Sequence, residues 1–200
     1  MLRFLPLPLL ACAFLTFPWT TRGETPDQKL LNLSLDSSID ALAASDFPRL
    51  VTLLHPVALR LFRNQLSAEF DELLLSQALN QLTVVSGLPQ HPKDLGLSDA
   101  EFFVAACENS RLRHPDLVDK GWFPLTEHGS IFDNDSLVLI TLSYTRRAKT
   151  ERTDYTFVKP LVISFRKEND NWYLWSAPLA NRIAAFWRQD LLTASVAAVN

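Results

Sequence analysis

The 200-residue chain is poor in several residue types that mark particular protein classes. Its five glycines are too scattered to form a phosphate-cradling loop, and two cysteines are too few for a disulfide scaffold. It also lacks the His-Glu-x-x-His zinc motif, the Cys-x-x-Cys pair and the serine nucleophile elbow. A net charge of −3 argues against a strongly basic nucleic-acid binder. We therefore expect no metal, no cofactor and no nucleic-acid partner.

The composition that remains, 48% hydrophobic and 20% charged, is typical of one globular domain. Residues 1–3 are a short positive start, and the apolar run 4–19 that follows is interrupted by three prolines. Because that run is too short and too broken to span a membrane, it predicts a signal peptide over 1–23 and an exported, periplasmic or extracellular domain over 24–200. Two alternatives stay open, an uncleaved anchor and lipidation at Cys12 in a lipobox-like Leu-Ala-Cys. A membrane contact through this N-terminal segment is expected only in those two cases.

The hydrophobic pattern changes near residue 120, from helical spacing to the aromatic-rich alternation of strands. It predicts helices over about 25–44, 47–54, 98–110 and 178–197, and one opening at His55-Pro56 whose end is left open between 73 and 82. It predicts strands over 127–132, 137–146, 155–166 and 171–176. Helices followed by strands indicate an α+β fold. We expect N-terminal helices packed on a bent, cone-like antiparallel sheet of about four strands, with a C-terminal helix.

Two local features set the expected geometry of the last hairpin. Asn169-Asp170 suits a tight turn, because both residue types tolerate a positive φ, and this turn pairs Phe165 with Leu174. Pro160 lacks the N–H that a strand donates to its neighbour. It therefore predicts a bulge and a bend in the third strand.

The order of elements resembles a known superfamily. The stretch from Leu137 to Trp175 is similar to the closing hairpins of the nuclear transport factor 2-like superfamily, which includes ketosteroid isomerase-like and polyketide-cyclase-like proteins. Its ending from Phe165 to Trp175 looks like the habitual finish of that group, a charged turn followed by a tryptophan and a terminal strand. The segments 55–59 and 101–103 resemble exported members. The resemblance, over about 28–176, implies a cavity at the wide end of the cone but no particular reaction.

Aromatic residues of the strand-rich half are the candidate contacts for a small hydrophobic ligand in an apolar cavity. They are Trp122, Tyr144, Tyr155, Phe157 and Trp175. The first function that we expect is therefore an exported binding or accessory module.

An acid–base isomerase or dehydratase acting on a small carbonyl compound is the second candidate function. The donor to its enolate oxygen would be Tyr144 or Tyr155, and candidates for its base are Glu127, His128 and Asp154. No motif fixes their spacing, so the sequence assigns no catalytic residue.

A third candidate function is partner binding, as a homodimer through the outer face of the sheet, where Tyr173 and Trp175 lie beside Arg166. The basic stretch 146–152 is expected to be a solvated hairpin tip, with contact to phosphate or an anionic surface as the alternative.

Other reactive residue types have structural interpretations. Cys107 lies in an apolar stretch and is expected to be a buried hydrophobic residue. His55, His91 and His114 each precede proline, which favours helix starts or loop corners.

Overall fold

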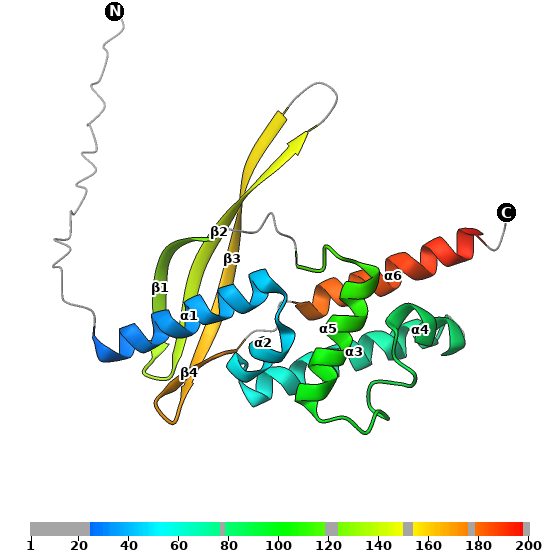
Figure 1. The fold of residues 1–200 in the computed structure, drawn as a ribbon, viewed down its shortest axis with the longest axis horizontal. Coiled ribbons are helices and arrows are strands. Elements are labelled where there is room, and N and C mark those ends of the chain that lie inside the picture. Colours follow the sequence, from blue (N-terminus) through cyan, green and yellow to red (C-terminus); the bar gives the residue numbers. More distant parts are fainter. Residues whose placement is uncertain (1–24, 77–78, 119–123, 150–153, 176–178, 198–200) are drawn as a thin grey trace, which may run out of the picture.

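The computed structural model describes residues 25–76, 79–118, 124–149, 154–175 and 179–197 (Figure 1). Six helices and four strands occur in these ranges: α1 (Pro26–Ala44), α2 (Phe47–Leu53), α3 (Pro56–Leu74), α4 (Leu79–Ser86), α5 (Asp99–Arg113), β1 (Thr126–Asn134), β2 (Leu137–Lys149), β3 (Asp154–Glu168), β4 (Asn171–Leu174) and α6 (Leu179–Ala197). The strands form one antiparallel sheet in the order β1-β2-β3-β4. The predicted α+β class is confirmed. The predicted signal peptide lies outside the described residues.

Side-chain caps fix where the helices begin. The Oγ1 atom of Thr25 accepts the amide hydrogen of Gln28 at the start of α1, and an Asp46 carboxylate oxygen accepts that of Arg49 in α2. Ser98 and Glu101 form a reciprocal capping box at the start of α5, as their three-residue spacing predicts. Each cap satisfies a backbone N–H that has no partner inside its helix.

The last hairpin has the predicted turn and register. Asn169 and Asp170 have φ values of 49° and 61°, in the left-handed region that this tight turn requires. Phe165 is paired with Leu174, and beyond β4 the amide of Trp175 still donates to the carbonyl of Ser164 at 2.7 Å. The turn chemistry therefore sets which residues of β4 face the core.

The predicted bulge at Pro160 is wrong. β2 and β3 pair without a register shift, with Ser143 opposite Pro160, and the irregularities lie in β1 instead, the first next to Gly129. Alternate residues of a strand direct their backbone groups to the same side, so Pro160 shares the side on which Ser164 bonds beyond β4. β4 pairs only with residues 165–168, so the absent N–H falls on an open edge and costs no ladder bond.

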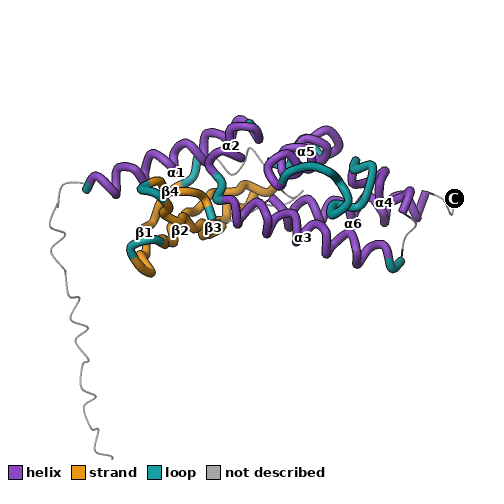
Figure 2. The backbone as a smooth tube through the Cα atoms, turned by 90° about the horizontal axis from the view of Figure 1, so that it is seen from below, coloured by secondary structure: helices purple, strands orange, loops and turns teal. Residues whose placement is uncertain are grey.

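The helices divide into a part over the sheet and a part beside it. α1 lies along the sheet, whereas α3, α4, α5 and α6 gather next to it (Figure 2). The core is continuous through both parts. In the helical part it is centred on Phe62, Phe70, Phe102 and Phe103, and in the sheet on Val138, Ile140, Phe165, Trp172 and Leu174. None of the helices described is both long and apolar enough to cross a bilayer.

Candidate functional site

A cavity of about 120 Å³ lies between α1 and the sheet. Its described lining residues come from α1, from the residue before β1 and from three strands. They are Ser38, Ile39, Leu42, Leu125, Leu142, Tyr144, Pro160, Leu161, Ile163 and Leu174. The spacing of the first three places them on one face of α1. By the register and the two-residue alternation, Leu142, Tyr144, Leu161, Ile163 and Leu174 share the inner face of the sheet, whereas Pro160 reaches the cavity from the edge of β3. The cavity is thus built from the apolar face of a helix and the inner face of a sheet.

The lining is apolar apart from two hydroxyl groups. The Oγ of Ser38 donates to the carbonyl of Ser34 at 2.7 Å, so this hydroxyl is used within α1. Leu142 and Ile163 are buried, whereas Tyr144 and Pro160, farther along the β2–β3 hairpin, are partly or fully exposed. The cavity therefore has its rim on the side of the hairpin tip, with Tyr144 at that rim.

The structure separates the predicted ligand contacts. Tyr144 lines the cavity, but Trp175 does not: it follows Leu174, and successive strand residues point to opposite faces. Its ring packs on His55, with 4.6 Å between ring centroids, and under the guanidinium of Arg166, which is 4.6 Å from the ring centroid. Tyr155 and Phe157 belong to β3, opposite Ala148 and Arg146 in the register, and nothing is described of their side chains. Trp122 lies outside the described residues.

Of the residues proposed for acid–base chemistry, Glu127 and His128 are not among the described lining residues, and nothing is described of the side chain of Asp154. Glu127 is exposed on β1, opposite Leu142. His128 contacts the Oγ of Ser143 through Nε2 at 2.6 Å, and Asp154 begins β3 opposite Lys149. Among the described lining residues, Tyr144 carries the one ionisable side chain. The described wall therefore contains a tyrosine hydroxyl but no carboxylate or imidazole base.

His55 connects the start of α3 to strands β3 and β4. It is 6% exposed, and its Nδ1 accepts the amide hydrogen of Val57, which caps α3. Nε2 lies 2.9 Å from a carboxylate oxygen of Glu168, so this nitrogen carries the proton and both ring nitrogens are engaged. The backbone N–H of His55 also donates to Leu174. The helix start predicted at His55 is confirmed, and the ring has no free nitrogen for catalysis.

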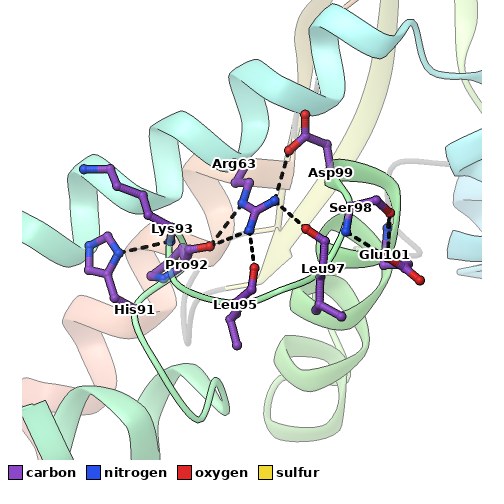
Figure 3. A network of polar contacts seen from close by, with 9 residues as sticks. All are labelled: Arg63, His91, Pro92, Lys93, Leu95, Leu97, Ser98, Asp99 and Glu101. Atoms are coloured by element: carbon purple, nitrogen blue, oxygen red, sulfur yellow. Dashed lines mark hydrogen bonds and ion pairs between the residues drawn. The ribbon is translucent and has the colours of Figure 1, made fainter.

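Arg63 organises the loop between α4 and α5, and sequence reasoning missed it. Its guanidinium donates to the carbonyl oxygens of Pro92, Leu95 and Leu97 and pairs with Asp99 at 3.2 Å (Figure 3). One cation thus satisfies three loop carbonyls that would otherwise need water. No local signal reveals this role, because the acceptors lie about thirty residues farther along the chain.

A second hollow, of about 440 Å³, lies between α3 and α6. Among its lining residues, Glu69 and Arg188 form a two-point ion pair with distances of 2.5 and 2.6 Å, and Gln65 bonds Asn181. The Glu69 carboxylate raises the pKa of the Arg188 guanidinium. The carboxylate and the guanidinium are paired with each other, so this hollow joins two helices rather than offering a free charge to a ligand.

Another polar contact fastens α1 to the sheet. A carboxylate oxygen of Asp27 accepts from the Lys167 ammonium at 2.7 Å and from the Trp172 indole at 3.1 Å. The bond from Lys167 is the main cause that lowers the pKa of Asp27, and the same bond raises the pKa of Lys167. The helix that roofs the cavity is therefore anchored by charge as well as by packing.

Two further kinds of reactive group remain, a thiol and potential metal ligands. Cys107 is buried as predicted, and burial raises the pKa of its thiol well above the ordinary value, which disfavours a reactive thiolate. In the part of the chain that the structure describes, no three His, Cys, Asp or Glu side chains gather closely enough to hold a metal ion.

The outer face of the sheet, where we predicted a homodimer contact, carries exposed aliphatic side chains. Ile131 is 66% exposed and Val162 is 56% exposed, where a solvated antiparallel sheet usually carries polar residues. The oligomeric state stays a prediction.

No protein-family model, curated protein or solved structure matches this chain. The resemblance to the nuclear transport factor 2-like superfamily therefore stays a prediction, and the function is inferred from the site itself.

Proposed function

We propose that this protein is a binding module that holds a small apolar group between α1 and the sheet. One observation carries the proposal: the cavity, of about 120 Å³, is lined mainly by aliphatic side chains and has one tyrosine at its rim. Burial of apolar surface is the main source of affinity in such a pocket, and a few polar groups orient the ligand. Export, predicted from residues 1–23, would make it an accessory module outside the cytoplasm.

The volume limits the ligand. Pockets for drug-sized molecules measure roughly 300–1,000 Å³, whereas an apolar cavity of about 150 Å³ binds benzene. The cavity between α1 and the sheet is close to the second case. It accommodates a six-carbon ring or the end of an alkyl chain, with any polar end of the ligand at the Tyr144 rim.

An acid–base enzyme is the weaker candidate for this site. Such an enzyme needs a base within about 3 Å of the proton that it removes. The described lining residues supply no carboxylate or imidazole, and His128 is engaged with Ser143. Binding without turnover fits this wall better.

Methyl-detected NMR of the full chain tests the proposal with toluene and phenol as probes. We expect shifts confined to the methyl groups of the lining, with a Kd on the order of 1 mM for a ligand of six or seven heavy atoms. Leu161→Phe narrows the cavity from a partly exposed position and is expected to weaken binding about tenfold or more.

The matched control is Leu112→Phe, the same exchange at an exposed position of α5. It should leave the titration unchanged. Shifts scattered over the whole molecule, or equal binding by the Leu161 and Leu112 variants, would contradict a pocket between α1 and the sheet.

A further inference from the structure

The β2–β3 hairpin is longer than the sheet to which it belongs. β1 pairs with β2 no farther than Ser143, and β4 pairs with residues 165–168 of β3. Residues 144–149 and 154–159 pair with each other beyond those limits, and we call them the ribbon. At about 3.4 Å per residue, six residues extend about 20 Å. Figure 1 shows these two strands rising clear of the sheet and of α1.

The ribbon is basic in an acidic chain. It contains four basic residues, Arg146, Arg147, Lys149 and Lys159, against the single acid Asp154, whereas the whole chain has a net charge of −3. Cations gathered on a projecting element create a local positive potential that an overall negative charge does not cancel at close range. The ribbon is therefore suited to an anionic partner.

The register adds apolar residues to these charges. Alternation along the strands places Tyr144, Arg146 and Ala148 of β2 on one face of the ribbon, together with their partners Lys159, Phe157 and Tyr155 of β3. Three aromatic residues thus share a face with two cations. At the base of the opposite face, Val158 is 63% exposed.

We propose that the ribbon docks on the surface of a lipid bilayer that contains anionic phospholipids. Tyrosine and phenylalanine at the headgroup level, next to arginine and lysine, are the composition of segments that lie in a membrane interface. The cations attract lipid phosphates, and the aromatic rings bury apolar surface among the headgroups. This contact does not involve residues 1–23, and it shares only Tyr144 with the cavity.

A nucleic acid is the other anionic partner to consider. Binding to nucleic acid at physiological salt relies on many phosphate contacts, commonly six to ten for a tight complex. The ribbon contains four basic residues. Five of its twelve residues are aromatic or apolar: Tyr144, Ala148, Tyr155, Phe157 and Val158. Such residues gain free energy in a lipid interface and little against a phosphate backbone. The composition therefore favours the bilayer.

Sedimentation of the full chain with vesicles tests the proposal. The vesicles are phosphatidylcholine alone or phosphatidylcholine with added phosphatidylglycerol, each at low and high salt. The wild-type chain is expected to bind the anionic vesicles more strongly, and high salt should reduce that difference. Removal of two cations in Arg146→Ser plus Arg147→Ser should lower the partition coefficient about 25-fold, since each basic residue contributes about fivefold.

The matched charge control is Lys29→Ser plus Arg60→Ser, at exposed positions of α1 and α3. It carries the same charge change and shares residues 1–23, so the difference between the two variants reports the ribbon alone. Phe157→Ser should weaken binding about tenfold and keep the salt dependence, whereas Phe132→Ser on β1 should not. Circular dichroism verifies that each variant is folded.

Three results would overturn the proposal. One is equal partitioning of the ribbon variant and its charge control, and another is equal binding to neutral and anionic vesicles. The third is tighter binding of a single-stranded oligonucleotide than of anionic vesicles, which would assign the ribbon to nucleic acid.

Discussion

Individual residues were predictable where their partners are close in the sequence. Ser98 and Glu101 are three residues apart, so the capping box could be read directly and is confirmed. The histidines before proline followed from backbone sterics, and His55 does cap α3. The role of Arg63 could not be predicted from the sequence, because its partners belong to a loop that only the packing of α3 against α5 brings within reach. Contacts between residues close in the sequence can be predicted from local spacing, whereas the contacts of a long side chain with distant residues depend on the tertiary fold.

The buried serines give a prediction at this scale. The Oγ of Ser67 is buried in α3 with no hydrogen-bond partner among the described residues. Its dehydration costs free energy that no bond returns. Ser67→Ala is therefore expected to raise the free energy of unfolding in urea by about 1 kcal/mol. Ser38→Ala is the control, since that buried hydroxyl donates to Ser34, and it should bring no such gain. A similar change in both variants would contradict the explanation.

Secondary-structure elements were predicted well because period, caps and turns act over short distances. The sequence does not determine that α3 ends at Leu74 and that α4 begins at Leu79, since the apolar run around these residues fits one helix or two. The bulge expected at Pro160 failed because the pattern does not show how far the neighbouring strand extends. Local sequence determines whether a segment is a helix or a strand, but it does not determine which elements pack or pair beside that segment.

The anchor of α1 on the sheet gives a prediction at the scale of elements. Because Lys167 lowers the pKa of Asp27 from 3.8, the charged carboxylate stabilises the fold above that pH and loses its effect as the pH falls through the lowered value. Asp27→Asn is expected to lower Tm by about 2 °C at neutral pH, and the gap to the wild-type chain should close in acid.

Thermal unfolding followed by circular dichroism across pH tests this anchor. The control is Asp36→Asn, an exposed carboxylate on the same helix, whose effect on Tm should stay flat from neutral to acid pH. At the alkaline end the same bond should weaken as the pH rises through the raised pKa of Lys167. A gap between Asp27→Asn and wild type that persists in strong acid would show that packing, not charge, holds α1.

At the scale of the whole molecule, the fold class followed from the order of elements, but the site did not. Tyr144 lines the hollow, because it continues the inward alternation of Leu142, and its role as a ligand contact stays a prediction. Residue type alone suggests the same site for Trp175, but the register that pairs Phe165 with Leu174 turns Trp175 to the other face of the sheet. The size of the cavity depends on how α1 sits on the sheet, and no local pattern fixes that distance.

The same tertiary arrangement predicts how the molecule unfolds. His55 joins the helical part to the sheet through its backbone bond to Leu174, its bond to Glu168 and its ring contact with Trp175. His55→Ala removes both side-chain contacts and the cap of α3, so we expect a loss of about 2 kcal/mol of unfolding free energy. The transitions followed by near-ultraviolet and far-ultraviolet circular dichroism should also separate, because the two parts no longer unfold as one.

His91→Ala is the matched control for this joint. His91 makes the same kinds of contact, since its Nδ1 accepts from Lys93, its Nε2 lies 2.9 Å from Asp71 and its ring meets the edge of Phe70. All of these partners belong to the helical part, so its loss should lower stability without separating the two transitions. If both variants unfold in a single transition, the shared apolar core, and not the contacts of His55, makes the unfolding of the two parts cooperative.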